Sequence, residues 1–397
     1  MKRLITALFI LAGLCCPFLL SAQDSWQSLI NRLTYYSPEK YKLATDNLKK
    51  KYPDSYRPDK DFEKALEELK ADKETLIKGL KAKDPKAEKQ TQKLLQQLDA
   101  ALLANPLLAG KQVVAIRRTL GDNARKAMSG GLGIAPSNFQ NNSEIGNPKT
   151  GWTNEFVSLN IAPGKIKQTT IYKPEQGMII TDPEPHFDGN KLMYSSIGTS
   201  DRWQLFELDM KTGKTRQLTP DTYKDFDSFD GCYTPDGRYI FCSTGTFLGL
   251  PCTNGGNKMC GLYLYDPKTQ LTRQLTYDQD SNWDPVMMEN GMLLYQRWEY
   301  ADLPHSNSRV MFTMNPDGTS QSAFYGSNSY FPTSFFSARP IPGRPSAIVG
   351  IATGHHSVSR SGRLLVIDTR KGRHEADGVI AEIPHAGRKV EPLVRDR

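Results

Sequence analysis

The chain has 397 residues, with 51 Lys and Arg against 43 Asp and Glu and a formal net charge of +8. The basic excess lies in the first 150 residues, and the remainder is close to balance. A nucleic-acid-binding protein would show a basic face interleaved with aromatic residues, so we do not expect nucleic acid as a partner. The length leaves room for two or more domains.

Residues 1–23 have the pattern of a signal peptide. Two basic residues precede an apolar run that ends in Ser21-Ala22. We therefore expect an exported protein, periplasmic or at the cell surface. No later apolar stretch is long enough to cross a bilayer, so no transmembrane segment is expected after signal removal. A lipid anchor at Cys15 or Cys16 is not expected, because a leucine stands where lipidation needs a small residue.

Residues 24–104 are predicted to form a helical N-terminal segment. One helix follows the apolar spacing from Phe62 to Leu80. A second begins with Pro85 in its first turn, a position that suits proline, and ends before Asn105, which precedes another proline.

Residues 105–397 contain a repeated phrase. LFELDMKTGKTRQLT (205–219) and LYLYDPKTQLTRQLT (262–276) each read as a strand, a turn opened by Asp, and a second strand. Turn-opening residues recur about every 50 residues, which marks a repeat fold. These residues are Asn160, Asp209, Asp266, Asn315 and Asp368.

A second phrase, a Gly turn followed by an alternating strand, leads each unit. Two strand pairs per unit give four strands, which is the blade of a β-propeller. The sequence thus predicts a mainly β fold with about five or more visible blades. It ends in GRKVEPLVRDR, which reads as the start of another unit, so we expect the propeller to be incomplete at its C-terminus. A two-sheet β-sandwich is the alternative.

The repeated phrases resemble the PD40 repeats of TolB-like propellers. Longer phrases, such as FDSFDGCYTPDGRYIFCSTGTFLGLPC (226–252) and SNWDPVMMENGMLLYQRWEY (281–300), are similar to the exported group related to the middle domain of the hydrazine synthase alpha subunit. Covalent haem attaches through C-x-x-C-H, which this chain lacks, so no covalent haem is expected. The resemblance implies an exported propeller used for another purpose.

Acidic residues recur at the entrance to each unit. In a propeller they would surround a central opening, where they could hold a cation or bond one blade to the next. A structural turn is the plainer interpretation. The candidate ligand-binding residues are Asp182, Glu184, His186, Asp227, Asp230 and Asp284.

Two other groups are candidate sites. His355 and His356 follow a glycine and could bind a metal, since histidine is the commonest metal ligand. A polar turn is the alternative for this pair. Trp298, Tyr300 and His305 occupy an aromatic segment that could stack on a sugar or peptide, although such residues also fill cores.

After signal removal four cysteines remain, all within one repeat. An even count in an exported chain favours disulfides, and a bridge between Cys252 and Cys260 would staple the segment between them. Cys-rich metal binding is the alternative, although the spacing lacks C-x-x-C. The disulfide candidates are Cys232, Cys242, Cys252 and Cys260.

These patterns predict an exported, non-catalytic propeller that binds a protein, a glycan or another ligand of the cell envelope, with no required cofactor. The first alternative is a metal- or redox-dependent enzyme or subunit, with a divalent metal held by His186, His355 and His356. A hydrolase whose catalytic part lies beyond residue 397 is a third hypothesis.

Overall fold

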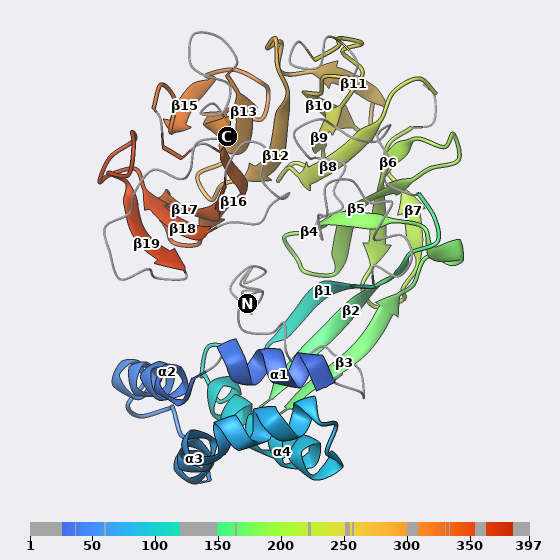
Figure 1. Ribbon diagram of the computed structural model, residues 1–397. Coiled ribbons are helices and arrows are strands. Elements are labelled where there is room, and N and C mark those ends of the chain that lie inside the picture. The colour runs from blue at the N-terminus through green and yellow to red at the C-terminus, as the bar shows by residue number, and fades with distance from the viewer. Residues whose placement is uncertain are drawn as a thin grey trace. The chain divides into compact units, whose positions relative to one another are not determined.

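The computed structural model, shown in Figure 1, divides the chain into two compact units. One unit comprises residues 5–115 and 156–171, and the other comprises 1–4, 116–155 and 172–397. The structure describes residues 26–35, 37–58, 61–119, 149–162, 165–220, 224–250, 255, 258–299, 309–329, 331–332, 334–353 and 363–383. The predicted signal peptide and the C-terminal phrase lie outside these residues.

The first unit contains the helices. They are α1 (Trp26–Tyr35), α2 (Pro38–Lys51), α3 (Phe62–Lys81) and α4 (Pro85–Leu103). The two predicted helices are α3 and α4, whereas α1 and α2 were not predicted separately. Asp84 caps α4, because its carboxylate accepts a hydrogen bond from the Lys86 amide at 2.9 Å. None of the described helices has the length and hydrophobicity needed to cross a bilayer.

The helices form one apolar core. Leucines on all of them except α2 are buried together, and α2 adds Tyr41. Most of the stability of such helices comes from this shared apolar face rather than from helix propensity. The buried residues are Leu29, Leu33, Tyr41, Phe62, Ala65, Leu66, Leu69, Leu76, Leu80, Leu94, Leu95, Leu98 and Ala101.

A three-stranded sheet has residues in both units. Its strands are β1 (Gln112–Thr119), β2 (Thr153–Ala162) and β3 (Lys165–Tyr172), in the order β1-β2-β3. The repeat expected at Asn160 falls at the end of β2. That repeat is therefore part of a three-stranded sheet and not of a complete blade.

The described residues of the second unit form four antiparallel meanders of four strands each, which we name blades I to IV. The 3-10 turn η3 (Glu175–Gly177) leads into blade I. Blade I is β4 (Ile180–Pro185), β5 (Lys191–Ile197), β6 (Trp203–Asp209) and β7 (Thr215–Gln217). Blade II is β8 (Ser228–Tyr233), β9 (Tyr239–Ser243), β10 (Gly261–Asp266) and β11 (Leu271–Gln274).

The last two blades are joined. Blade III is β12 (Asn282–Met287), β13 (Leu293–Trp298), β14 (Arg309–Met314) and β15 (Ser322–Tyr325). Blade IV is β16 (Ser334–Ile341), β17 (Arg344–Thr353), β18 (Arg363–Asp368) and β19 (Val379–Ile383). A parallel bridge between Arg309 and Ser334 connects the two blades into one eight-stranded sheet.

The repeated Arg-Gln-Leu-Thr phrase has the same structural role in blades I and II. The Leu205 amide donates to Thr219 Oγ1 at 3.1 Å, and the Leu262 amide donates to Thr276 Oγ1 at 2.9 Å. In each blade the glutamine of the phrase donates its side-chain amide to the carbonyl of the same threonine, at 2.8 and 2.7 Å. The phrase therefore ends each blade by satisfying backbone groups beyond the short fourth strand.

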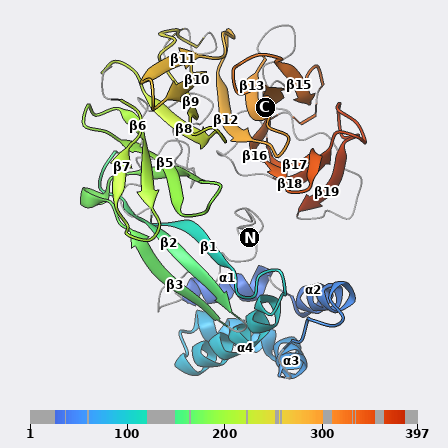
Figure 2. The ribbon, with the colours of Figure 1, turned by 180° about the vertical axis from the view of Figure 1, so that it is seen from behind.

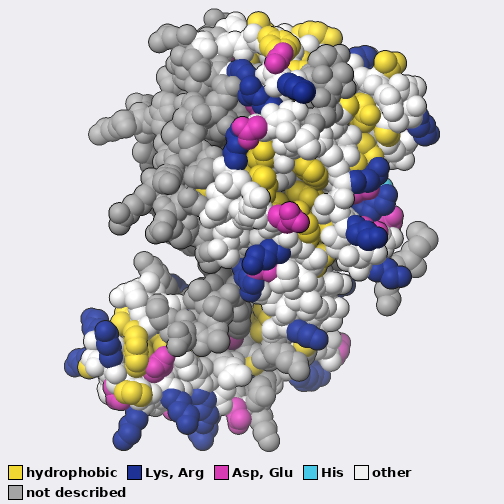
Figure 3. Space-filling view, turned by 90° about the vertical axis from the view of Figure 1, so that its right-hand side faces the viewer, with side chains coloured by type: hydrophobic (Ala, Val, Ile, Leu, Met, Phe, Trp, Pro, Cys, Tyr) yellow, Lys and Arg dark blue, Asp and Glu magenta, His cyan; other side chains and the backbone are white. Residues whose placement is uncertain are grey.

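The predicted fold class and blade type are confirmed by the strand pairing, and the described residues form four complete blades where about five or more were expected. The described residues form mainly β structure, with four-stranded blades preceded by helices. Figure 2 shows the blades following one another in chain order, and the first strands β4, β8, β12 and β16 contact one another in sequence. In the view of Figure 3, basic and acidic side chains are interspersed over the surface, which agrees with the near balance of charge.

Candidate functional site

The first strand of every blade contains a β-bulge at the same place. The register between the first and second strands shifts there, and one residue adopts a positive φ of about 50°. Asp tolerates this left-handed conformation better than most residues, because its short side chain bonds locally. The bulged residues are Asp182, Asp230, Asp284 and Ser337.

Three of these bulges are linked from blade to blade. The Asp284 amide donates to Asp230 Oδ2 at 2.8 Å, and the Ser337 amide donates to Asp284 Oδ2 at 2.9 Å. We call this pattern the bulge link. The Asp230 amide donates in turn to Ser195 Oγ of blade I at 2.8 Å. Carboxylate acceptors strengthen such bonds, and both carboxylates are buried.

An ion pair joins blade I to blade IV beside these links. Arg339 Nη2 lies 3.5 Å from Glu184 Oε2, and both side chains are about four-fifths buried. Burial raises the pKa of Glu184, and Arg339 partly offsets that effect. Burial opposes the charge of Arg339, but the carboxylates of Glu184, Asp284 and Asp230 together raise its pKa. The blades thus share one buried electrostatic cluster.

A second arginine lies near Asp182. Arg118 donates from Nη2 to the Ile180 carbonyl and lies 5.9 Å from the Trp152 ring centroid. Burial lowers the pKa of Arg118 to about 10, and the negative charge of Asp182 works against that shift. The expected acid of blade I therefore faces a cation supplied by the chain itself.

His186 does not join the acids of its own strand. Its Nδ1 lies 2.9 Å from Asp188 Oδ1, and its ring packs edge-on against Tyr233 of blade II at 4.7 Å. Within the described residues no group of three or more His, Cys, Asp or Glu side chains is placed to hold a metal ion. The predicted ligand-binding role of His186 stays a prediction.

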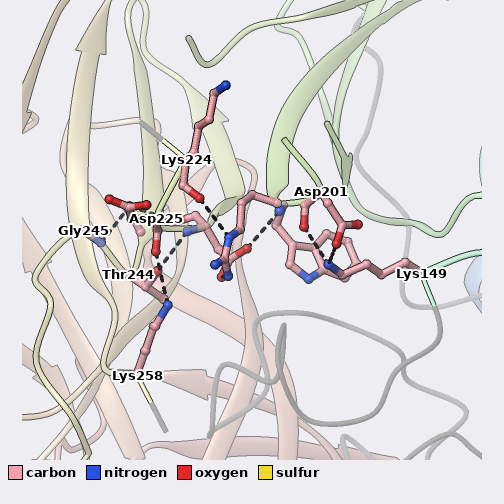
Figure 4. A network of polar contacts seen from close by, with 11 residues as sticks. Lys149, Asp201, Lys224, Asp225, Thr244, Gly245 and Lys258 are labelled. Atoms are coloured by element: carbon pink, nitrogen blue, oxygen red, sulfur yellow. Dashed lines mark hydrogen bonds and ion pairs between the residues drawn. The ribbon is translucent and has the colours of Figure 1, made fainter. Parts of the chain in front are cut away.

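Asp227 joins blades I and II near the ends of their strands. It accepts the Trp203 amide at 3.0 Å, and Arg202 Nη1 lies 3.9 Å from its other oxygen. Its own amide donates to Thr244 Oγ1 at 2.9 Å, and its carbonyl accepts from Ser243 Oγ at 2.9 Å. Figure 4 shows this network. With a side chain almost fully buried, Asp227 acts as a structural junction.

Trp298 lies in the core, which is the alternative that the sequence left open for this residue. It is 2% exposed, and its ring stacks on Trp283 at 6.1 Å and 25°. The guanidinium of Arg309, itself fully buried, lies 4.3 Å from the Trp298 ring centroid. The Trp298 ring therefore makes its stacking and cation–π contacts in the interior of the protein. Tyr300 and His305, and likewise the predicted metal ligands His355 and His356, lie outside the described residues.

The predicted disulfide is not formed. Cys232, Cys242 and Cys260 are buried and belong to no disulfide, and Cys252 lies outside the described residues. Cys242 and Cys260 both direct Sγ at the Asn282 carbonyl, at 3.6 and 3.2 Å. Burial raises the pKa of the Cys232 and Cys242 thiols. These cysteines thus serve as small core side chains, a common use of buried cysteine.

Sequence reasoning missed a buried acid, Asp280. It is 2% exposed, and its Oδ1 has no hydrogen-bond partner among the described residues. Burial raises its pKa to about 6, which Arg309 opposes and Asp278 reinforces. Arg339 and Ser337 were missed as well, because the fourth repeat has Ser337 where the earlier ones have an aspartate. The step from Asp230 to Asp284 is 54 residues, and the same step taken again ends one residue after Ser337.

No family model matches the chain, and no curated protein matches it. Among solved structures it is similar to a putative TolB from Agrobacterium tumefaciens, at 13% identity and a TM-score of 0.41, over 56% of this chain and 73% of that one. It is also similar to hydrazine synthase from Kuenenia stuttgartiensis, at 14% identity and a TM-score of 0.47, over 65% of this chain. The match spans 37% of that synthase chain.

A third similar structure is an oligogalacturonate lyase in complex with manganese. It shares 14% identity with a TM-score of 0.38, over 70% of this chain and 75% of the lyase. The blades themselves are established by strand pairing within this chain.

The bulge link predicts a graded loss of stability. Asp230→Ala and Asp284→Ala should each lower the free energy of unfolding by about 2 kcal/mol, because a buried amide loses its charged acceptor. Asn at either position keeps an acceptor oxygen and tolerates the positive φ, so it should cost less. Urea unfolding measures the difference.

The control is Asp201→Ala. Asp201 also has a positive φ, of 57°, but its side chain is 79% exposed and pairs only at the surface with Lys149. A loss at Asp201 as large as that at Asp230 or Asp284 would show that backbone conformation, and not the link, accounts for the effect.

Asp280 predicts a specific pH dependence. A carboxyl whose pKa is higher in the folded state binds its proton more tightly there, so its contribution to stability falls as pH rises from 3.8 to about 6. Asp280→Asn should therefore stabilise the protein at pH 7, by up to about 3 kcal/mol, and have little effect below pH 4. Denaturant unfolding at several pH values checks this expectation.

Asp278→Asn is the matched control for Asp280. Asp278 Oδ1 lies 2.9 Å from Arg297 Nη2, and its other oxygen accepts from the Asn282 side chain at 3.1 Å. Its substitution should destabilise the protein at pH 7. Stabilisation by Asp280→Asn that is equal at pH 4 and pH 7 would contradict the assignment.

Proposed function

We propose that the chain is an exported, non-catalytic β-propeller that binds a protein or glycan ligand of the cell envelope through one end of its blades. The observation that supports this proposal is that the buried charged residues bond to other groups of the protein. Asp227, Asp230 and Asp284 accept hydrogen bonds from neighbouring strands and blades, and Glu184 pairs with Arg339. These residues build a scaffold, which supports binding at the strand ends.

The strand connections support a preference for one end. All blades meander alike, so the connections between second and third strands lie at a common end. In blade II this connection runs from 244 to 260, in blade III from 299 to 308, and in blade IV from 354 to 362. In these three blades the connections between first and second strands are shorter, for example 234–238 and 342–343, whereas in blade I the connection between second and third strands, 198–202, is no longer than these. Longer connections on a rigid scaffold are typical of binding surfaces.

Export is the second part of the proposal, and it is motivated by the sequence of residues 1–23. The metal- or redox-enzyme alternative depends on His355 and His356, which lie outside the described residues. It therefore stays a prediction. The hypothesis of a hydrolase whose catalytic part lies beyond residue 397 also stays a prediction.

Binding and export are tested together in the native cell. The full chain should lose its leader and fractionate with the envelope, whereas a chain lacking residues 1–23 should remain inside the cell. The purified mature chain, immobilised, should retain a protein or glycan from solubilised envelope fractions, and soluble chain should compete it away. An unrelated exported protein on the same resin is the control. Retention no greater than on that control would contradict the binding proposal.

A further inference from the structure

Two of the buried cysteines lie together at the interface between blades II and III. Cys242 is near the end of β9, and Cys260 directly precedes β10. Both side chains are fully buried, and their Sγ atoms lie 3.6 and 3.2 Å from one oxygen, the carbonyl of Asn282. The two thiols are also hydrogen-bonded to each other. We name these two cysteines the Cys242 pair.

The backbone holds the Cys242 pair in place. Cys242 lies opposite Leu262 in the ladder between β9 and β10. The Cys260 amide donates to Ser281 Oγ at 3.1 Å, and the Cys260 carbonyl accepts from the Asn282 amide at 3.0 Å. These bonds fix both sulfur atoms at the same carbonyl, so the pair is pre-organised for a ligand that bridges two sulfur atoms.

Cys232 shows what core packing alone requires. It lies on β8, and its side chain is 1% exposed. Its charged neighbours are Glu184, Asp230 and Arg339, and among the described residues it has no hydrogen bond to another thiol. At this position a cysteine is an ordinary small core side chain. The Cys242 pair differs, because two sulfur atoms converge on one acceptor.

The number of ligands narrows the class of metal ion that the pair could bind. Within the part of the chain that the structure describes, no group of three or more His, Cys, Asp or Glu side chains is placed to hold a metal ion. Structural zinc almost always takes four ligands. The Cys242 pair offers two sulfur ligands with one carbonyl oxygen nearby, a set that suits a soft monovalent ion such as Cu(I).

The surrounding charge also favours a monovalent cation. Asp230 Oδ2 lies 3.8 Å from Cys242 Sγ, and Asp230 also accepts the amide of Asp284, whose carboxylate is buried as well. Loss of a thiol proton without a cation would add negative charge beside these two carboxylates. A monovalent cation that displaces one thiol proton leaves the net charge of the buried cluster unchanged, so it adds no further cost of burying charge.

We propose that the Cys242 pair binds a soft monovalent metal ion of the Cu(I) class between Cys242 Sγ and Cys260 Sγ, beside the Asn282 carbonyl. Each ion that binds releases one thiol proton to solvent, the second sulfur donates a lone pair as a thiol, and no electron is transferred. The bound ion ties the end of β9 to the start of β10 and thereby stabilises the fold. The site lies inside the scaffold, so it does not depend on the proposed binding function.

The test measures retention of Cu(I) by the full chain under nitrogen. Cys15→Ser and Cys16→Ser are included throughout, so that the leader contributes no thiols. Because the Cys242 pair is buried, Cu(I) is added both to the folded chain and during refolding from urea, and loosely held ion is removed with a chromogenic Cu(I) chelator. We expect about one copper ion per chain by at least one route, with sulfur ligands in the X-ray absorption spectrum.

Three serine variants locate the site. Cys242→Ser and Cys260→Ser should each lower the apparent Cu(I) affinity at least about a hundredfold, because each removes one of two ligands. Serine is close to cysteine in size, and its hydroxyl can donate to the same carbonyl, so both variants should fold. Cys232→Ser is the matched control. It removes an equally buried thiol and should retain the ion as the parent chain does.

Urea unfolding supplies a second readout. Cu(I) should raise the unfolding midpoint of the parent chain and of Cys232→Ser, and should leave that of Cys242→Ser unchanged. The proposal is overturned if neither route retains copper, or if copper is bound through nitrogen or oxygen alone. It is also overturned if Cys232→Ser or Cys252→Ser lowers the affinity as much as Cys260→Ser does. Retention of the envelope component is measured separately, so the binding function stands or fails by itself.

Discussion

The fold depends on carboxylates that satisfy backbone amides across blade boundaries. A bulge in the first strand of a blade turns one amide out of its own sheet, and a buried amide without an acceptor destabilises the fold. Asp230 and Asp284 supply that acceptor to the next blade, at 2.8 and 2.9 Å. Each acid therefore has two roles. Its positive φ forms the bulge in its own strand, and its carboxylate accepts a hydrogen bond from an amide of the next blade.

This arrangement explains which features of the fold could be predicted from the sequence. The Asp turns and the Arg-Gln-Leu-Thr phrase recur because each makes local hydrogen bonds that are the same in every copy, so strand number and blade type were predictable. Pairing between distant residues leaves no such local pattern. Glu184 and Arg339 lie in different blades, and the stack of Trp283, Trp298 and Arg309 needs three strands to meet. The disulfide at Cys260 was predicted wrongly for a similar reason, since the spacing of cysteines in the sequence does not show which of them are buried in the core.

The proposed function follows from the positions and partners of the buried charged residues. Of the two interpretations left open for the acids, a cation site or bonds between blades, the contacts of Asp230, Asp284 and Glu184 are of the second kind, and the molecule gains rigidity from them. Rigid blades allow the segments at their ends to hold side chains in positions that the free chain would avoid. Phe247 is the clearest case, since the hydrogen bond from its amide to the Thr244 carbonyl holds it at a positive φ with its side chain in solvent. The buried bonds between blades and the exposed segments at the blade ends are thus linked, because the first make the blades rigid and the second depend on that rigidity.

Native-state hydrogen exchange tests the central claim most directly. The amides of Asp284 and Ser337 should exchange only through global unfolding, with a free energy of exchange within about 1 kcal/mol of the free energy of unfolding. The Met292 amide is the comparison, because it also donates to a side-chain oxygen, that of Asn290, at 3.1 Å, but in an exposed turn. It should exchange much faster. Exchange of Asp284 and Ser337 at the rate of Met292 would show that carboxylates do not hold the blades together.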